Sequence, residues 1–371
     1  MFKRVIYIFL LLILVACSKK TDDRTILHSN DYAEGYAVET FDGYTVVEVR
    51  NPWDTLEILQ RYILVPKTSE LSDEMPDGVV VRTPVERTAV YASLHCGMIK
   101  ELRKEHTITG ICDVHYNADL DLKRRVEVGE VADLGSSFLP DVEKIISIAP
   151  EVIIVSPYKD KGDDKVSRLG IPVIEMADYM ESVPLARTEW IKFLSMLFEC
   201  EELADSIFQA TEDEYNTLAK VGRSIENRPT LLCELKTGGV WYQPGGESYM
   251  AQLYRDAGID YLWSDNNDKG SISLSYEEVF ARGAGADLWL MKYADENDKT
   301  LKSLVEEYPP YANFKPCSDK NVWGVNALKV PFYEEMPLYP HYVLRDLMLM
   351  AHPELFLESD TTRYLKKLSD E

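Results

Sequence analysis

Cys17 is the residue whose chemistry is most clearly marked by its surroundings. It ends the run Leu14–Cys17, after a short apolar stretch that follows Lys3 and Arg4. This pattern is typical of a bacterial lipoprotein signal, and the stretch is shorter than the about 18 apolar residues that a membrane-spanning helix needs. We therefore expect residues 1–16 to be cleaved off as a signal peptide and the Cys17 thiol to be acylated, which anchors the protein. A cleaved secretory signal without lipid is the alternative.

Two glutamates occupy matching positions in two similar segments. Glu143 lies in a segment, 141–155, that reads as a capped helix, a tight turn and a buried strand, and Glu277 lies in the same pattern over 275–290. Each glutamate follows a helix-cap candidate by two residues, where a carboxylate favours the helix dipole. Capping explains each glutamate singly, but it explains the paired recurrence poorly. The recurrence indicates a duplicated unit.

Residues just after the predicted strands are the candidates for ligand contacts, because ligands of open α/β sheets bind beyond the carboxyl ends of the strands. Three lysines stand at such places and suit an anionic chelate or carboxylates, although loop lysines commonly face water: Lys159, Lys236 and Lys292. Segment 238–249 is rich in glycine and aromatic residues, which is typical of a loop where a large flat ligand stacks or of one that seals a core. The expected aromatic contacts are Trp241, Tyr242 and Tyr249.

Histidines offer a further possibility. His95 and His115, with Tyr116, fall in loops or helix starts of the first half, so they are candidate ligand contacts and conceivable axial ligands to haem iron or cobalt; a satisfied polar contact is the plainer interpretation. The chain has six histidines and no histidine-rich loop, which disfavours a free zinc or manganese site. We expect no protein-bound metal and no cofactor.

The composition restricts the partners. The formal charge of −23 argues against nucleic acid and against a helix lying flat on anionic lipid. After Cys17, five cysteines remain without Cys-x-x-Cys spacing, so buried free thiols are expected rather than a disulfide framework, although one bond between Cys96 and Cys112 is conceivable. Small molecules and protein surfaces are the expected partners.

The elements that must position these residues follow an α/β rhythm. Two strands flanking Asp42-Gly43 predict a hairpin, with a third strand at 61–65. Short apolar runs then alternate with helical patterns, as in a parallel sheet covered by helices. These predicted strands are 88–92, 108–111, 151–155 and 173–176.

Between the two similar halves, the pattern predicts a helical connector. Residues 185–198 and 201–225 carry apolar residues at helical spacing, and the second helix is long enough to brace both halves. The stretch 344–350 predicts a last docking helix. The fold class is thus α/β with two lobes, each with a mainly parallel sheet flanked by helices, joined by one long connecting helix and preceded by a β-hairpin extension. The expected divisions are a signal peptide (1–16), a lipidated cysteine with a tether (17–30), a first lobe (31–184), the connector (185–226) and a second lobe (227–371).

With these features, the chain resembles the class III periplasmic substrate-binding lipoproteins of ABC importers for ferric siderophores, haem and cobalamin. The likeness covers roughly Arg87 to Phe356, and its specific points are the motifs around Glu143 and Glu277. The resemblance implies that these two glutamates form salt bridges with arginines of an ABC permease, which works with its ATPase. It also implies a monomer on the periplasmic face of a bacterial membrane, possessing no enzymatic activity, that captures an iron chelate, haem or cobalamin between its lobes.

Two alternatives stay open. One is a metal-chelatase-like enzyme on a bilobal scaffold, although no nucleophile elbow or His-Glu-x-x-His motif occurs. The other is a surface lipoprotein that captures a nutrient without a permease, since the polar residues after Cys17 are compatible with surface export.

Overall fold

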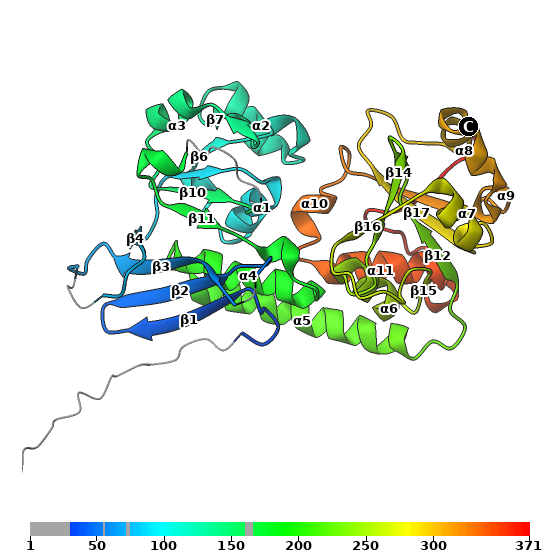
Figure 1. The fold of residues 1–371 in the computed structure, drawn as a ribbon, viewed down its shortest axis with the longest axis horizontal. Coiled ribbons are helices and arrows are strands. Elements are labelled where there is room, and N and C mark those ends of the chain that lie inside the picture. Colours follow the sequence, from blue (N-terminus) through cyan, green and yellow to red (C-terminus); the bar gives the residue numbers. More distant parts are fainter. Residues whose placement is uncertain (1–29, 55, 72–74, 160–165) are drawn as a thin grey trace, which may run out of the picture.

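The computed structural model describes residues 30–54, 56–71, 75–159 and 166–371. Two lobes stand side by side above a layer of helices, and a separate small sheet lies beside the first lobe (Figure 1). The signal peptide, Cys17 and nearly all of the expected tether lie outside the described residues. Within the described part of the chain, no helix is long and apolar enough to cross a membrane.

The first lobe is built on a fully parallel sheet of five strands in the order β11-β10-β5-β6-β7. Its strands are β5 (Thr88–Val90), β6 (Ile108–Ile111), β7 (Ala132–Asp133), β10 (Val152–Val155) and β11 (Val173–Glu175). The helices are α1 (Ser93–Glu101), α2 (Leu120–Glu127) and α3 (Val142–Ile148), and a small hairpin joins β8 (Gly135–Ser136) to β9 (Leu139–Pro140). The four strands predicted for this lobe are confirmed within one or two residues.

The second lobe repeats this topology. Its sheet has the order β15-β12-β17-β18-β19, parallel except for the last strand. The strands are β12 (Thr230–Cys233), β15 (Asp260–Tyr261), β17 (Leu288–Tyr293), β18 (Val322–Asn326) and β19 (Lys366–Lys367). The order β15-β12-β17-β18 matches β6-β5-β10-β11 strand for strand in chain sequence, so the predicted duplication is confirmed at the level of topology.

Additional elements cover the second sheet. A three-stranded antiparallel sheet consists of β13 (Lys236–Thr237), β14 (Val240–Pro244) and β16 (Ser271–Leu274). The helices are α6 (Tyr249–Asp256), α7 (Tyr276–Gly283), α8 (Leu301–Glu307), α9 (Lys315–Ser318) and α10 (Phe332–Glu335). Asp141 and Ser275 cap α3 and α7 through their side chains, and Ser275 forms the predicted capping box with Glu278.

The connector consists of α4 (Pro184–Met196) and α5 (Glu201–Arg223), both close to their predicted bounds. At about 1.5 Å per residue, the 23 residues of α5 span roughly 34 Å. Ala204 near its start belongs to the first lobe's core, whereas Tyr215 and Ala219 belong to the second lobe's core. One rigid helix therefore braces both lobes, as Figure 1 shows.

The chain crosses back to the first lobe before it ends. Helix α10 packs against α1, and the Ala118 amide donates to Glu334 Oε1 at 2.9 Å. Leu338 is buried in the first lobe's core. The predicted last helix, α11 (Pro340–Ala351), then packs on α5. The two lobes are thus joined by this second crossing as well as by the connector.

The N-terminal extension is larger than the predicted hairpin. The hairpin of β1 (Tyr36–Phe41) and β2 (Tyr44–Arg50) is confirmed, and so is a third strand, β3 (Ile58–Pro66). A fourth strand, β4 (Val79–Thr83), pairs with β3 in parallel. The side chains of this sheet share the first lobe's core, where Tyr36 meets Trp190 edge to face with ring centroids 5.0 Å apart.

The five described cysteines are all free, with Cys96, Cys112 and Cys233 buried. The expectation of buried thiols is confirmed for these three, and the conceivable Cys96–Cys112 bond is absent from the described structure. Burial raises the pKa of the Cys112 and Cys233 thiols to about 12, so both stay protonated at neutral pH.

A fully buried carboxylate in α4 fastens the start of the extension. Glu189 accepts hydrogen bonds from the backbone amides of Asp31, Tyr32 and Ala33 at 2.8–2.9 Å. We expect Glu189→Ala to leave these amides unsatisfied and to destabilise the segment before β1 by about 3 kcal/mol. Hydrogen exchange should then quicken at residues 31–38 and stay unchanged in the second lobe. Glu212→Ala, which removes the hydrogen bonds from the Tyr32 hydroxyl and from the Gln209 side chain but none from a backbone amide of this segment, is the matched control, and an equal effect of both changes would contradict the assignment.

Candidate ligand-binding cleft

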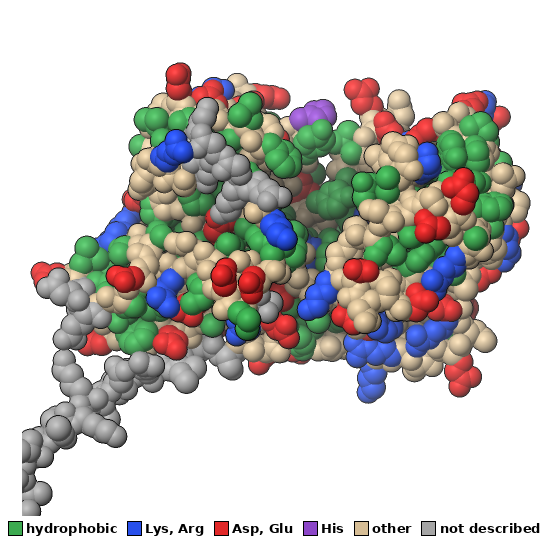
Figure 2. All heavy atoms as spheres, viewed as in Figure 1, with side chains coloured by type: hydrophobic (Ala, Val, Ile, Leu, Met, Phe, Trp, Pro, Cys, Tyr) green, Lys and Arg blue, Asp and Glu red, His purple; other side chains and the backbone are tan. Residues whose placement is uncertain are grey.

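A cleft of about 720 Å³ opens between the lobes. The second lobe supplies most of its wall, from the loops after β12 and β17 and from the start of α6. The first lobe contributes Tyr179 and Met180. A hollow between the two lobes is visible in the space-filling view (Figure 2). The site therefore lies where parallel α/β sheets place ligands, beyond the carboxyl ends of their strands.

A second pocket of about 420 Å³ lies at the carboxyl ends of β5, β10 and β11 in the first lobe. Tyr179 lines both pockets, and its hydroxyl donates to the Pro157 carbonyl at 2.5 Å. We call the two the second-lobe pocket and the first-lobe pocket. Because they share one side chain, a large ligand can contact both.

A partly buried ion pair forms part of the second-lobe pocket. Lys292 Nζ, at the end of β17, contacts the Glu234 carboxylate, which follows β12. Burial alone lowers the pKa of Lys292, but the Glu234 charge outweighs it and raises the pKa above its ordinary value. Glu234 adopts a positive φ of 61°, a strained conformation for a non-glycine residue, and such residues cluster at functional sites.

A second set of charges lines the same pocket. Lys299 contacts Glu307 at 2.5 Å and Asp295 at 3.3 Å. Burial alone lowers the pKa of Lys299, yet these two carboxylates raise it overall. Lys269 is exposed at the same pocket, where it makes no ion pair within the described residues. The second-lobe pocket thus presents both signs of charge to a ligand.

The floor of the cleft rests on a buried charge cluster. Asp178 is fully buried and contacts His95 Nε2 and an Arg187 guanidinium nitrogen, each at 3.2 Å. The Arg187 guanidinium stacks on the Tyr249 ring, 4.4 Å from its centroid. Burial alone raises the pKa of Asp178, but the His95 hydrogen bond and the Arg187 charge outweigh it and lower the pKa. The cluster links a buried acid of the first lobe to an aromatic wall of the cleft.

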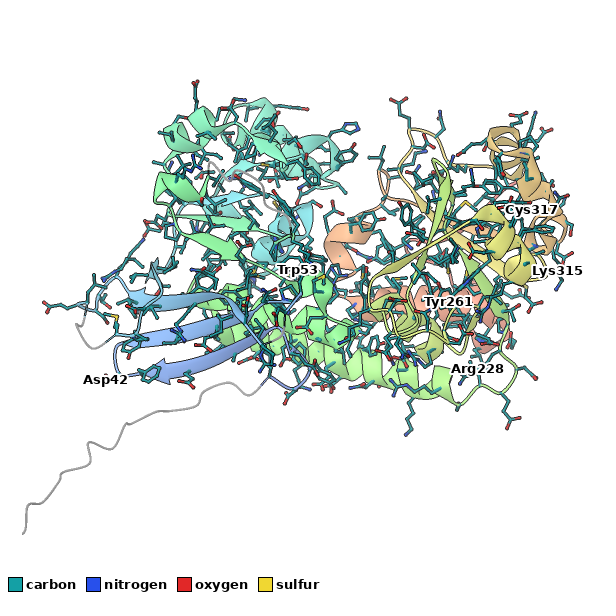
Figure 3. All side chains as sticks on the ribbon, in the orientation of Figure 1. Asp42, Trp53, Arg228, Tyr261, Lys315 and Cys317 are labelled. Atoms are coloured by element: carbon teal, nitrogen blue, oxygen red, sulfur yellow. The ribbon has the colours of Figure 1, made fainter. Side chains whose placement is uncertain are left out.

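Local backbone structure fixes Tyr249 at the first position of α6. Ser248 caps this helix through a hydrogen bond accepted from the Ala251 amide at 3.2 Å. Tyr261, labelled in Figure 3, donates to the Pro244 carbonyl at 2.6 Å and so fixes the end of β14. A Cβ on Gly245 would lie 2.2 Å from the Asp268 carbonyl oxygen. Glycine is therefore needed here for close packing, not for an open loop.

Three of the predicted contacts line the second-lobe pocket: Tyr242, Tyr249 and Lys292. For two other residues the predicted ligand contact is wrong, because both are buried away from the pockets. Trp241 is 0% exposed and donates from its indole nitrogen to the Cys233 carbonyl, so it seals the core. His95 is equally buried, with Asp178 as its partner, so it faces no ligand. Trp241 thus has the alternative role of sealing the core, and His95 makes the polar contact that was the alternative to binding a ligand.

The remaining predicted contacts lie outside both pockets. Lys236 Nζ donates to the Gly238 carbonyl and lies over the Tyr308 ring, so the ammonium group already has partners within the second lobe. His115 and Tyr116 are exposed and stack edge to face with centroids 5.2 Å apart. Lys159 is exposed. Their contact with a ligand stays a prediction.

Glu143 and Glu277 are both exposed at the second position of their helices, α3 and α7. Neither carboxylate has an ion pair with another described residue. They therefore occupy equivalent places in two lobes of equivalent topology, each presenting a free charge to solvent.

Some pocket residues were not foreseen. Phe138 and Leu139 lie at the β8–β9 hairpin in the first-lobe pocket, and Tyr179 lines both pockets. Tyr158 and Tyr293, by contrast, fall in the segments expected to contact a ligand just after the strands, although neither was singled out. Within the described residues, no three His, Cys, Asp or Glu side chains gather as a metal site.

Comparison with known proteins decides the family. The family model described as "Periplasmic binding protein" matches residues 89–324. The chain belongs to this family. The match covers the connector and most of both lobes, and it leaves out the β1–β4 sheet and residues 325–371.

Relatives of this periplasmic binding protein are lipoproteins, and solved structures share its fold. Two uncharacterised lipoproteins of Methanocaldococcus jannaschii are 28% and 24% identical, covering 81% and 83% of this chain and 73% and 80% of their own. A structure titled as an ABC-type Fe3+-hydroxamate transport system from Saccharomonospora viridis gives a TM-score of 0.57 at 16% identity, covering 72% of this chain and 93% of that one. A periplasmic heme binding protein from Pseudomonas aeruginosa gives 0.60 at 13% identity, covering 77% and 98%.

The charge cluster under the cleft of this periplasmic binding protein makes a stability prediction. Arg187→Met leaves Asp178 charged and buried with only His95, so we expect the free energy of unfolding to fall by about 3–5 kcal/mol. The double change Asp178→Asn with Arg187→Met removes both charges and should recover most of this loss. Urea unfolding at pH 7 measures both, and a double variant no more stable than the single one would contradict the explanation.

The lowered pKa of Asp178 adds a pH dependence. A carboxyl whose pKa is lower in the folded state stabilises the protein above its ordinary pKa and loses that contribution as the pH falls through the folded value. The stability gap between the wild type and Asp178→Asn should therefore narrow from pH 7 toward pH 3. A gap that stays constant over this range would refute the assignment.

Proposed function

We propose that this periplasmic binding protein is the substrate-binding component of an ABC importer, held at the outer face of a cytoplasmic membrane by lipid on Cys17. It captures an iron complex, either a ferric siderophore or haem, or else cobalamin, and delivers it to a permease without altering it chemically. The observation that carries the proposal is the cleft walled by two lobes of the same topology. A ligand held by both walls is released when a partner moves the walls apart.

The bracing of the lobes supports a small motion on binding. Helix α5 contributes to both cores, and α10 packs against α1 across the lobes. Opening the cleft must strain these contacts, so closure amounts to a limited rocking. The carboxylates of Glu143 and Glu277 are the proposed permease contacts, because a permease with two matching arginines can bind both lobes at once. Charge pairs of this kind fix the orientation of the two proteins.

The absorption spectrum of protein purified from its native host tests the ligand. Ferric siderophores, haem and cobalamin are all coloured, so we expect a visible band that co-elutes with the protein and returns when the stripped protein is reloaded. A colourless protein that also gives no heat with ferric trihydroxamate, haem or cyanocobalamin in calorimetry would refute the ligand class.

Delivery is tested by reversing two charges. Glu143→Arg with Glu277→Arg should abolish uptake in cells, because both proposed permease contacts become repulsive, and should leave ligand affinity in solution unchanged. Glu127→Arg with Glu306→Arg is the matched control, since these exposed glutamates lie on α2 and α8, one in each lobe. Equal loss of uptake in both pairs, or a loss of affinity in the first, would contradict the docking role.

A further inference from the structure

The first-lobe pocket carries an unusual amount of exposed apolar surface. Phe138 is 81% exposed, Leu139 is 79% exposed and Tyr158 is 42% exposed, and all three line the pocket. The Phe138 and Tyr158 rings lie 6.2 Å apart between centroids. Large apolar side chains gathered around a concavity mark a place where a partner removes them from water.

The charges around this pocket are few. Glu175 is the one charged residue among the described lining residues, and it is 6% exposed. No lysine, arginine or histidine lines the pocket in the described ranges. Apart from Glu175, the described part of the wall is apolar or uncharged, so it suits an apolar group of a ligand.

The hairpin that presents Phe138 is held in place rather than free. The Asp113 amide donates to the Gly135 carbonyl at 2.8 Å, and the Ser137 amide donates to Asp113 Oδ2 at 3.2 Å. The Gly135 amide in turn donates to Asp133 Oδ1 at 2.9 Å. The apolar tip is thus fixed before any ligand arrives, which lowers the entropic cost of binding there.

The second-lobe pocket has the opposite character. Its wall includes three ammonium groups and three carboxylates: Lys269, Lys292, Lys299, Glu234, Asp295 and Glu307. The two pockets meet at Tyr179, whose hydroxyl is fixed on the Pro157 carbonyl. The two pockets therefore adjoin at this residue, with a mainly apolar described wall in the first lobe and a charged wall in the second.

We propose that the first-lobe pocket is a subsite for an apolar, ring-bearing part of the ligand, and that the charged groups of the same ligand face the second lobe. This inference rests on the proposed function and narrows its ligand to an amphiphilic complex. A uniformly polar chelate would leave Phe138, Leu139 and Tyr158 exposed to water and would gain nothing from them.

The test uses Nile red, an uncharged planar dye, because its binding does not depend on the identity of the natural ligand. We expect wild-type protein to bind it with enhanced fluorescence. The double variant Phe138→Ser with Leu139→Ser should bind it about tenfold more weakly or worse, because two apolar side chains that the dye covers are lost. Both residues are exposed, so the fold should survive. Leu357→Ser is the control, since Leu357 is 73% exposed and lies in neither pocket.

Equal Nile red affinity in the three proteins, or no binding to the wild type, would overturn the subsite. Parallel titrations with haem and with a ferric trihydroxamate test the proposed function independently of the subsite. Haem, which joins an apolar macrocycle to carboxylates, should lose affinity in the Phe138 and Leu139 variant if it binds. If the dye result holds while no iron or cobalt complex binds the wild type, the subsite stands and the proposed function falls.

Discussion

The burial of Asp178 is the constraint on which the cleft depends. A carboxylate with no exposure to water must be paired, and its two partners come from different elements: His95 from α1 and Arg187 from α4. Arg187 then reaches the Tyr249 ring in the second lobe. The next residue after the buried acid, Tyr179, faces the cleft from the first lobe. One charge cluster therefore links the two opposing walls of the cleft beneath its surface.

Patterns that act over a few residues could be predicted from the sequence. The parallel strands, the caps at Asp141 and Ser275, and the connector helices all depend on local apolar spacing and on side chains that bond to nearby backbone. The size of the N-terminal extension could not be predicted in the same way. Its fourth strand, β4, pairs with β3 in parallel across an intervening segment, and nothing local marks such a partner.

The site was harder to predict because burial depends on tertiary packing. Trp241 and Tyr242 are neighbours in β14, and a strand turns successive side chains to opposite faces, so only Tyr242 faces the cleft. Sequence alone identified both aromatic residues but not which face was the core. Phe138 gave no signal at all, because it lies in the turn between two strands of two residues each, which are too short to show an apolar period.

The duplicated scaffold positions the two glutamates, whereas the insertions, which differ between the lobes, line the pockets. The equivalent helices α3 and α7 keep Glu143 and Glu277 in equivalent places, because each helix leads into the matching strand of its sheet. The additions differ: the first lobe carries the β8–β9 hairpin, whereas the second carries the β13-β14-β16 sheet. The hairpin lines the first-lobe pocket and the three-stranded sheet lines the second-lobe pocket. A partner that engages the scaffold can thus meet the same charges whatever ligand the insertions select.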